Sequence, residues 1–427
     1  MQQTGHVNSY YAATSHEQAA YPALHEAIST DVCIIGGGFT GVNAGLELAQ
    51  RGVKAVLLEA VRVGYGASGR NGGQIVNGYS RDLDVIVSRY GTKAGRAIGA
   101  MAREGGNIIR SRVAQYDIQC DLKPGGVFAA LNHAQLRGLA HHIKVWEACG
   151  FTEGFELVDK TDLQRHVQTE RYVGGLIDHF GGHLHPLNLV QGEAAAFVSL
   201  GGVVYENTPV ISVKFGDIIT VKTAQAEVKA KTLLICGNAY LQNVLPSLEA
   251  QIMPVSSQVL ATEPLGDAAQ ALLPTNMCVE DCNYILDYFR RTADNRILYG
   301  GGVVYGGQDP ASVRAKILPL MHKTFPSLRD ARIDYTWSGN FALTLSRFPQ
   351  MGRLAPNVYF SHGDSGHGVT TTHLLARLLA EALTGEAERF DIFAGLPFFP
   401  FPGGQKFRVP LTIAGSWWYR FRDAMGL

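Results

Sequence analysis

The stretch DVCIIGGGFTG, residues 31–41, decides the fold. Its apolar first half is typical of a strand buried in a parallel sheet, and its second half fits the glycine pattern G-x-G-x-x-G. Residues 42–51 then predict a helix that closes at Gly52, and residues 53–59 predict a second apolar strand. Together these elements make one βαβ unit. We therefore expect an α/β fold (α+β overall) with a Rossmann-like domain.

The three glycines of the G-x-G-x-x-G pattern are each required for a physical reason. Gly36 allows the tight turn, Gly38 lets a pyrophosphate approach the backbone, and Gly41 lets the helix pack closely on the sheet. The helix N-terminus offers free N–H groups and a positive partial charge to phosphates. Glu59 ends the next strand, where its carboxylate can accept hydrogen bonds from both ribose hydroxyls and would repel a 2′-phosphate. These features predict a dinucleotide other than NADP, with an ordinary glycine turn as the alternative.

Two further glycine-rich segments favour FAD over NAD. The first reads GYGASGRNGGQ over residues 64–74, and its small residues would let the chain run beside a tricyclic isoalloxazine ring. The second reads SHGDSGHG over residues 361–368 and leads into a predicted helix over 369–383, closed by Gly385. A helix N-terminus there would stabilise the negative charge of a reduced flavin. A surface loop and a simple helix cap are the respective alternatives.

The bulk composition excludes several classes of protein. Of the 427 residues, 46% are hydrophobic and 17% charged, which is normal for a globular protein with a substantial core. The 37 basic and 37 acidic side chains cancel, so nothing favours nucleic acid or an anionic membrane as a partner. No apolar run approaches the length of a membrane span and no signal peptide is recognisable. We therefore expect no transmembrane segment and a cytoplasmic location, and the sequence leaves the oligomeric state open.

Cysteines and histidines give no pattern typical of a metal site. The six cysteines lie at positions 33, 120, 149, 236, 278 and 282, and the closest pair lacks the CxxC spacing of zinc and redox sites. His183 and His185 form an H-x-H pair, but no carboxylate or cysteine partner accompanies them. We expect no metal and no disulfide, with a zinc site at the histidine pair as the alternative.

The rest of the chain alternates helical and strand patterns without a repeat. Residues 87–147 are mostly helical in pattern with a turn at 124–126, and Pro186 predicts the start of a helix that runs to about residue 199. Strands are expected at 203–205, 210–214, 218–222 and 233–236, and again within 256–299. The aromatic run WWYRFR at 417–422 is expected to pack on the rest of the chain or on a partner subunit, with a membrane-surface anchor as the alternative.

The three glycine segments together resemble those of the D-amino-acid-oxidase-like family of FAD oxidoreductases, which includes sarcosine and glycine oxidases. The resemblance covers nearly the whole chain and extends to HLHPLN at 183–188, CVEDCNY at 278–284 and PFPGG at 400–404. It implies an FAD-binding domain interleaved with a β-sheet-containing substrate domain, with the flavin between them. The boundaries that we expect are 28–95, 183–245 and 336–395 for the discontinuous FAD-binding domain, 96–182 and 246–335 for the substrate domain, and 396–427 for a C-terminal tail.

The resemblance also implies roles for individual residues. Glu59 would hold the ribose, the backbone of Val210 would meet adenine, and residues 366–370 would meet the pyrimidine edge of the flavin. His367 is the candidate catalytic base, with a structural loop histidine as the alternative. The full set of implied FAD contacts is Gly36, Gly38, Phe39, Thr40, Gly41, Glu59, Ala60, Arg62, Gly66, Ala67, Ser68, Arg70, Asn71, Gly72, Gly73, Gln74, Val210, Asn238, Gly339, Gly366, His367, Gly368, Val369 and Thr370.

Three departures from the family pattern bear on the chemistry. The stretch WSGNFAL at 337–343 lacks the arginine that grips the carboxylate in amino-acid oxidases, which favours an amine over an α-amino acid. No cysteine follows Cys282, so FAD is expected to be noncovalent, unlike the flavin of monomeric sarcosine oxidases. The stretch RILYG at 296–300 lacks the lysine of sarcosine-oxidase relatives, which leaves the oxygen-activating group unassigned.

Within the family, the sequence most specifically resembles members that oxidise the free primary amine of gamma-glutamylputrescine. It implies hydride transfer from the carbon beside a neutral amine to flavin N5, giving an aldehyde, ammonia and, with molecular oxygen, hydrogen peroxide. An amine dehydrogenase, a sarcosine-like secondary-amine oxidase and a flavin-binding subunit without turnover are the alternatives. The side chains expected to meet the substrate are Tyr284, Tyr288 and Phe289 for its methylenes and Arg290 and Arg291 for its glutamyl carboxylate, with core packing or surface exposure as the alternatives. Phe341 is a further expected substrate contact.

Overall fold

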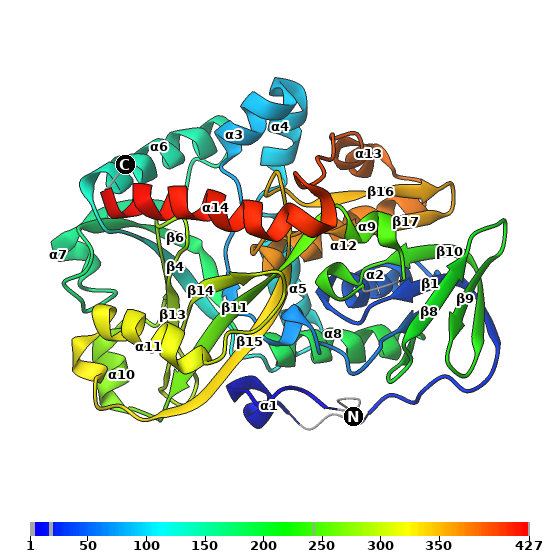
Figure 1. The fold of residues 1–427 in the computed structure, drawn as a ribbon, viewed down its shortest axis with the longest axis horizontal. Helices are drawn as coiled ribbons and strands as arrows, with labels where there is room; N and C mark the ends of the chain where they lie inside the picture. The colour runs from blue at the N-terminus through cyan, green and yellow to red at the C-terminus, as the bar shows by residue number, and fades with distance from the viewer. Residues whose placement is uncertain (1–4, 17–19, 242–243, 426–427) are drawn as a thin grey trace.

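Two β-sheets with their covering helices build the molecule (Figure 1). The computed structural model describes residues 5–16, 20–241 and 244–425. One sheet has eight strands and the other has nine, and we refer to them as the eight-stranded and the nine-stranded sheet. Across the described part of the chain, no helix is long and apolar enough to cross a membrane.

The eight-stranded sheet carries the βαβ unit that the sequence predicts. β1 runs parallel to β2 and β10, with Ile35 opposite both Leu58 and Ile235. Since parallel strands end at the same edge of a sheet, the turns that follow β1, β2 and β10 lie together. In spatial order the strands are β16 (Gln350–Ala355), β17 (Val358–His362), β10 (Glu227–Ile235), β1 (Ile28–Ile35), β2 (Ala55–Leu58) and β7 (Val203–Tyr205), with β9 (Ile219–Thr223) beside β10 and β8 (Val210–Lys214) beside β9.

Both faces of this sheet are covered, because the apolar residues of β1 alternate between them. Val32 and Ile34 join the main core together with the helices. Cys33 and Ile35 face the other way, into a core shared with Val221 of β9. The helices on the first side are α2 (Phe39–Gln50), α8 (Pro186–Ser199), α12 (Gly368–Leu383) and α5 (Glu104–Gln115), and α2 packs against both α8 and α12.

The nine-stranded sheet turns one face to its own core and the other to the eight-stranded sheet. Phe289 and Tyr299 stack in the core face, whereas Tyr288, one residue earlier, points to the opposite side. In spatial order its strands are β15 (Ile333–Thr344), β11 (Ile252–Thr262), β14 (Ile297–Tyr305), β13 (Tyr288–Arg291), β12 (Cys278–Asp281), β4 (Lys123–Ala130), β6 (Gly174–His183) and β3 (Gln74–Ile75), with β5 (Phe155–Asp159) also paired with β6.

The remaining helices surround these sheets (Figure 1). They are α1 (Tyr10–Thr14), α3 (Leu83–Tyr90), α4 (Thr92–Ala100), α6 (His133–Ala148), α7 (Lys160–Leu163), α9 (Pro246–Glu249), α10 (Asp267–Leu272), α11 (Val313–Thr324), α13 (Glu388–Ala394) and α14 (Gly404–Met425), with the short 3₁₀ helices η1 (Ala67–Gly69), η2 (Asn238–Tyr240) and η3 (Pro326–Leu328).

The expected C-terminal tail contains the long helix α14, which crosses the face of the molecule in Figure 1. Arg408 anchors it by donating to the carbonyl oxygens of Glu249 and Ile252. Trp417 and Trp418 are exposed, so these side chains of the aromatic run do not pack on the described part of their own chain.

One local expectation is wrong. The turn predicted at 124–126 lies within β4, where Gly126 pairs with Asp178 of β6. The register shifts between Pro124 and Gly126, and Gly125 has φ +85°, so the proline and glycines mark a β-bulge rather than a chain reversal.

The division into two interleaved domains stays a prediction. All strands of the eight-stranded sheet fall within the ranges expected for the FAD-binding domain. The nine-stranded sheet draws most of its strands from the other ranges, but it also takes β3 and most of β15 from the first set.

Candidate active site

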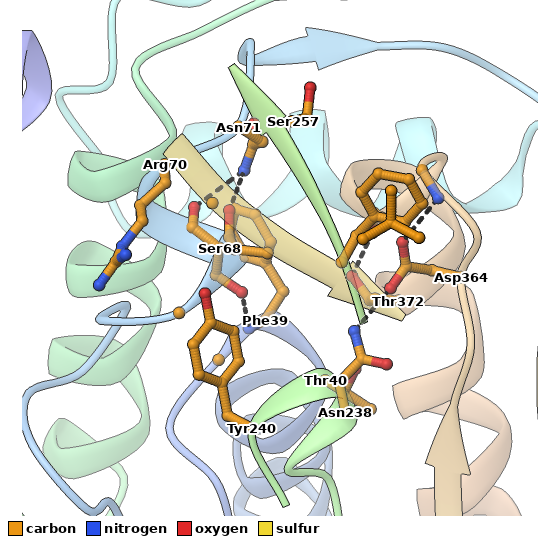
Figure 2. Close-up of a pocket in the computed structure, with 18 of the residues that line it drawn as sticks. Phe39, Thr40, Ser68, Arg70, Asn71, Asn238, Tyr240, Ser257, Asp364 and Thr372 are labelled. Atoms are coloured by element: carbon orange, nitrogen blue, oxygen red, sulfur yellow. Dashed lines mark hydrogen bonds between the residues drawn. The ribbon is translucent and has the colours of Figure 1, made fainter. Parts of the chain in front are cut away.

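A cavity of about 570 Å³ lies where the two sheets meet. Ligand sites in proteins typically enclose about 300–1,000 Å³. Its walls come from the turn after β1, residues 58–76, 208–210, 236–241 and 244, the inward face of the nine-stranded sheet, and residues 364–372. Figure 2 shows how side chains from these distant segments converge on it.

The turn between β1 and α2 forms the first wall. Gly36 has φ +107°, and a Cβ there would lie 2.8 Å from the carbonyl oxygen of Cys236. A Cβ at Gly41 would lie 2.0 Å from the carbonyl oxygen of Gly36, so only glycine lets α2 pack this closely. Ser68 Oγ accepts the Phe39 N–H at 2.9 Å, while other first-turn N–H groups have no acceptor inside the helix (Figure 2). This end of α2 therefore presents donors and a positive dipole to an anion.

Glu59 lies at the carboxyl end of β2, beside this turn. Its carboxylate accepts the Gly37 N–H at 2.7 Å and the Val61 N–H at 2.9 Å. Burial raises the pKa of this carboxyl, and the two backbone N–H groups counteract the rise. A carboxylate has about four acceptor positions, so positions remain for ribose hydroxyls.

The segment 64–74 forms the second wall and is held from behind by β15. Trp337 Nε1 donates to the carbonyl oxygen of Arg70 at 2.9 Å, and a Cβ at Gly339 would lie 3.0 Å from Arg70 Cβ. The guanidinium lies over the ring of Tyr65, 4.4 Å from its centroid, and Nε donates to the Tyr65 carbonyl oxygen. Arg70 Nη2 is buried without a partner among the described residues. Because an unsatisfied buried donor is costly, this atom marks a place for a ligand acceptor.

The segment 361–368 forms the third wall. Asp364 accepts hydrogen bonds from Asn238 Nδ2 at 2.7 Å and from the Gly366 N–H at 3.1 Å (Figure 2). The Gly363 N–H donates back to Asn238 Oδ1 at 3.0 Å. Asn238 therefore ties the turn after β10 to the turn after β17, and the N-terminus of α12 follows directly.

His367 occupies the N-cap position of α12, without a capping hydrogen bond from its side chain, and lines the cavity. Its Nδ1 is buried and has no partner in the described part of the chain. Burial lowers the pKa of His367 to about 4, so the imidazole is neutral near pH 7. A ring with so low a pKa is a weak acceptor for the proton of an aliphatic ammonium.

Beyond these walls the cavity extends over the nine-stranded sheet. Tyr288 stands there between two glycines, since a Cβ at Gly72 would lie 2.6 Å and one at Gly300 2.1 Å from its ring. Its hydroxyl lies 3.4 Å from Ser257 Oγ, and burial raises the pKa of Tyr288 to about 12, so the phenol stays protonated. Phe341 of β15 completes this aromatic wall.

Arg347 lines the cavity from the tight turn after β15. Its backbone has φ +56°, and its N–H donates to the carbonyl oxygen of Thr344 at 3.1 Å. The guanidinium carbon lies 3.9 Å from the ring centroid of Tyr284. A non-glycine residue in this strained conformation is common at ligand sites.

The structure brings most of the predicted residues to this one cavity. All predicted FAD contacts line it except Gly41, Arg62 and Gly73, and Tyr284, Tyr288 and Phe341 line it among the predicted substrate contacts. Gly41 lies in the first turn of α2, where it packs against Gly36 and Ile34 on the sheet side. Arg62 is instead paired with Glu206 at 2.8 Å.

Phe289, Arg290 and Arg291 do not line the cavity, which corrects three expectations. Arg290 is 1% exposed, and it donates to the carbonyl oxygen of Gly72 at 2.7 Å and to the Tyr11 hydroxyl at 3.1 Å. It supports the wall from behind. Phe289 faces the core, because successive residues of a strand point to opposite faces.

The two histidines of the H-x-H pair, His183 and His185, each make a separate hydrogen bond to the backbone. His183 Nε2 donates to the carbonyl oxygen of Asn276 at 2.7 Å, whereas His185 Nδ1 caps α8 by accepting the Asn188 N–H at 3.1 Å. Burial lowers the pKa of each ring to about 3, so both are neutral.

Many residues of the cavity wall were not predicted, and five of them carry polar groups that bear on the site. Glu280 and Asp364 belong to segments whose pattern had drawn notice, and the alternation along β11 could have placed Ser257. Tyr240 and Arg347 carry no local signal, because the packing of distant turns brings them to the cavity.

Residues 31–382 match the model of the family described as FAD dependent oxidoreductase (DAO). The chain belongs to this family and is an FAD-dependent oxidoreductase. It is 52% identical to gamma-glutamylputrescine oxidoreductase of Escherichia coli (strain K12) over 426 residues, which covers 99% of this chain and 100% of that relative. The resemblance expected from the sequence motifs is therefore confirmed.

Solved structures show the same fold. L-proline dehydrogenase from P. horikoshii superposes with a TM-score of 0.72 at 20% identity, covering 85% of this chain and 94% of that one. Glycine oxidase from Bacillus cereus ATCC 14579 gives a TM-score of 0.69 at 19% identity, covering 85% and 97%. At these identities the likeness concerns the fold alone.

The cavity fits FAD by its own chemistry. Arg70 and His367, each with a buried nitrogen that has no partner among the described residues, line one cavity together with Glu59 and the first residues of α2 and α12. Carbonyl, phosphate and hydroxyl groups of a flavin dinucleotide are the complements of these groups.

Proposed function

We propose that this chain oxidises the free primary amine of gamma-glutamylputrescine, or of a similar glutamylated polyamine, to an imine, which water hydrolyses to an aldehyde and ammonia. Molecular oxygen would receive the electrons and become hydrogen peroxide. The observation that carries the proposal is the cavity wall beyond the cofactor segments, where Tyr288 and Phe341 stand and β15 contributes no arginine. The 52% identity over the whole chain to the Escherichia coli enzyme supports the same substrate.

The two ends of the substrate need different surroundings. The methylenes of putrescine suit the aromatic wall of Tyr284, Tyr288 and Phe341. The glutamyl carboxylate needs a cation, and Arg347 is a guanidinium at the cavity wall on the substrate side. We therefore assign the carboxylate to Arg347 rather than to Arg290, whose guanidinium is buried behind the wall.

Bound FAD supplies the two-electron acceptor for the carbon beside the amine. The residues of the chain hold and shield the reactants. The N-termini of α2 and α12 and the carboxylate of Glu59 bind the cofactor, and Asn238 fixes the turn before α12. The apolar wall excludes water, and the protonated phenol of Tyr288 offers a hydrogen bond near the substrate.

A dehydrogenase that uses another electron acceptor is the second candidate. Among the described residues, no lysine lines the cavity. Arg296, in the stretch where sarcosine-oxidase relatives carry a lysine, is bound to Asp294 and Asp334 at 2.6 Å each. In the part of the chain that the structure describes, the cavity therefore has no lysine that could stabilise the negative charge formed when oxygen is reduced.

The proposal is tested by anaerobic bleaching of the bound flavin with gamma-glutamylputrescine, putrescine and sarcosine. We expect fast bleaching by the glutamylated amine, slower bleaching by putrescine and none by sarcosine. Air admitted afterwards should restore the colour and release one equivalent of peroxide; slow return of colour with air but fast return with a quinone would favour the dehydrogenase. Acid precipitation of the same preparation should release the yellow colour, since FAD is noncovalent. Failure of all three amines to bleach the flavin would refute the proposed function.

A further inference from the structure

Glu280 brings a carboxylate into the cavity from the middle of the nine-stranded sheet. It lies on β12 opposite Tyr288 of β13. Its neighbours on the strand face the other way, since Val279 is packed in the core and Asp281 is buried on that same side. Glu280 therefore lines the cavity together with Gln74 and Tyr288.

The carboxylate of Glu280 has no counter-charge. Within the described part of the chain, no hydrogen bond or ion pair reaches its oxygen atoms. Arg171 is held on the opposite face by Asp281 at 3.2 Å and Asp287 at 2.8 Å. Burial, and secondly the charge of Asp281, raise the pKa of Glu280 to about 8. A buried acid without a donor or cation is costly, so its position in a cavity points to a ligand.

The other acidic groups of the cavity wall already have partners. Glu59 accepts two backbone N–H groups, and Asp364 accepts the amide of Asn238 and a further backbone N–H. His367 is neutral and weakly basic. Of the described acidic residues that line the cavity, Glu280 alone has both oxygen atoms available.

We propose that the carboxylate of Glu280 binds the reacting ammonium of the substrate and takes its proton, which leaves a neutral amine for oxidation. One N–H bond breaks and one O–H bond forms, so an ammonium and a carboxylate become an amine and a carboxylic acid without a change of oxidation state. The neutral amine is needed because its lone pair must stabilise positive charge as the neighbouring carbon loses hydride. This inference rests on the proposed function, since it assigns a contact to the amine of that substrate.

The groups that face Glu280 set the pH dependence of this step. The thiols of Cys278 on β12 and of Cys282, just after this strand, lie on the same side as Glu280, and burial raises the pKa of each thiol, so both stay protonated. Asp281 acts on Glu280 through its charge from the opposite side of the strand. Tyr288 of β13 also stays protonated, and residues 126–129 of β4 bring no titratable side chain. The value of kcat/KM should rise through about pH 8, as Glu280 ionises, and fall above about pH 10, as free substrate loses its ammonium proton.

The test is anaerobic titration of the FAD-loaded enzyme with two ligands that differ only at the amine end. gamma-Glutamylputrescine carries the ammonium, and gamma-glutamylpentylamide has a methyl group in its place. The first Kd comes from the concentration dependence of bleaching, and the second from the perturbation of the flavin absorbance. Glu280→Gln should weaken binding of the amine about tenfold or more and of the pentylamide by less than about threefold. In the same variant, kcat/KM should keep rising to about pH 10.

Two further variants make the outcome decisive. Glu156→Gln removes an exposed carboxylate from β5 of the same sheet and should change neither affinity nor pH profile. Glu280→Asp keeps the charge and should keep the preference for the amine, with a lower limiting rate of bleaching because the carboxylate is farther away. Equal weakening of both ligands in Glu280→Gln, an unchanged pH profile, or loss of the amine preference in Glu280→Asp would overturn the proposal while the function stands. Absence of bleaching in the wild-type enzyme would overturn the function and this inference with it.

Discussion

At the scale of single residues, two glycines determine where Tyr288 stands. Gly72 comes from the segment beside the cofactor and Gly300 from β14, and the ring fills the space that a side chain at either position would need. The hydroxyl of Tyr288 then lies within reach of Ser257, and the ring faces the cavity. Tyr288 can therefore form part of the proposed substrate wall only because positions 72 and 300 are glycines.

We expect Gly300→Ala to lower kcat/KM for gamma-glutamylputrescine about tenfold or more while FAD content stays near that of the wild type. The new Cβ would lie 2.1 Å from Tyr288 Cζ, so the ring must leave its position. Displacements of about 1 Å in an active site can cost a hundredfold in rate. Gly138→Ala on α6 is the control, because its Cβ would meet nothing within 4 Å. Steady-state kinetics that are identical in both variants would contradict this role of Gly300.

At the scale of elements, a buried charge network joins four helices behind the cofactor segments. Arg112 of α5 contacts Glu47 of α2 at 2.6 Å and Glu193 of α8 at 3.7 Å. From α12, His373 contacts Glu193 at 2.9 Å and Arg377 contacts Glu47 at 3.0 Å. Both carboxylates are buried, so the loss of a cationic partner would leave a buried charge uncompensated.

Arg112→Met should destabilise the protein by about 3–5 kcal/mol, since it leaves two buried carboxylates short of a cation. Urea unfolding followed by far-UV circular dichroism should show a clearly lower midpoint. Arg137→Met, at an exposed position of α6, provides the comparison and should shift the midpoint little. A midpoint for Arg112→Met equal to that of Arg137→Met would show that the network does not stabilise the fold.

Elements whose ends are set by neighbouring residues could be predicted from the sequence. Elements whose ends are set by contacts with distant segments could not. Pro186 fixes the first turn of α8, and the helix ends at Ser199 where the pattern predicts. α2 begins at Phe39, three residues earlier than expected, beside the hydroxyl of Ser68 from a later segment. Likewise, a glycine indicates by itself a close approach or an unusual backbone conformation, so clusters of glycine predicted the segments that line the FAD site. Arg347 and Glu280 enter the site through turns and strand pairing that only the folded chain defines.

At the scale of the whole molecule, buried neutral histidines tie stability to pH. Burial lowers the pKa of His183, His185 and His362 to about 3 each. In the unfolded chain a histidine is protonated below about pH 6.5. In the folded protein these three rings become protonated only below about pH 3. The unfolded state therefore binds more protons in this window, so stability is full above about pH 6.5 and declines as the pH falls.

The unfolding temperature should consequently drop between pH 7.5 and pH 5.5, at a cost of about 1 kcal/mol per ring at the lower pH. His362→Gln removes one of these rings and should make the drop smaller, whatever its effect at pH 7.5. His141→Gln on α6 removes an exposed ring and should leave the drop unchanged. Differential scanning fluorimetry at both pH values measures this, and equal drops in wild type and His362→Gln would refute the assignment.

The walls of the cavity come from both ends of the chain, and this has a consequence for biosynthesis. The turn at 36–41 leaves the ribosome early, but residues 364–372, which close the same cavity, follow on the order of tens of seconds later at ordinary rates of translation. The complete set of walls exists only once nearly all of the chain has been made, so we expect FAD to bind late, after residues 364–372 have folded into place. A chain that stays without FAD lacks the ligand that would bind its folded state and stabilise it, so we expect a shortage of flavin to reduce the amount of this protein as well as its occupancy.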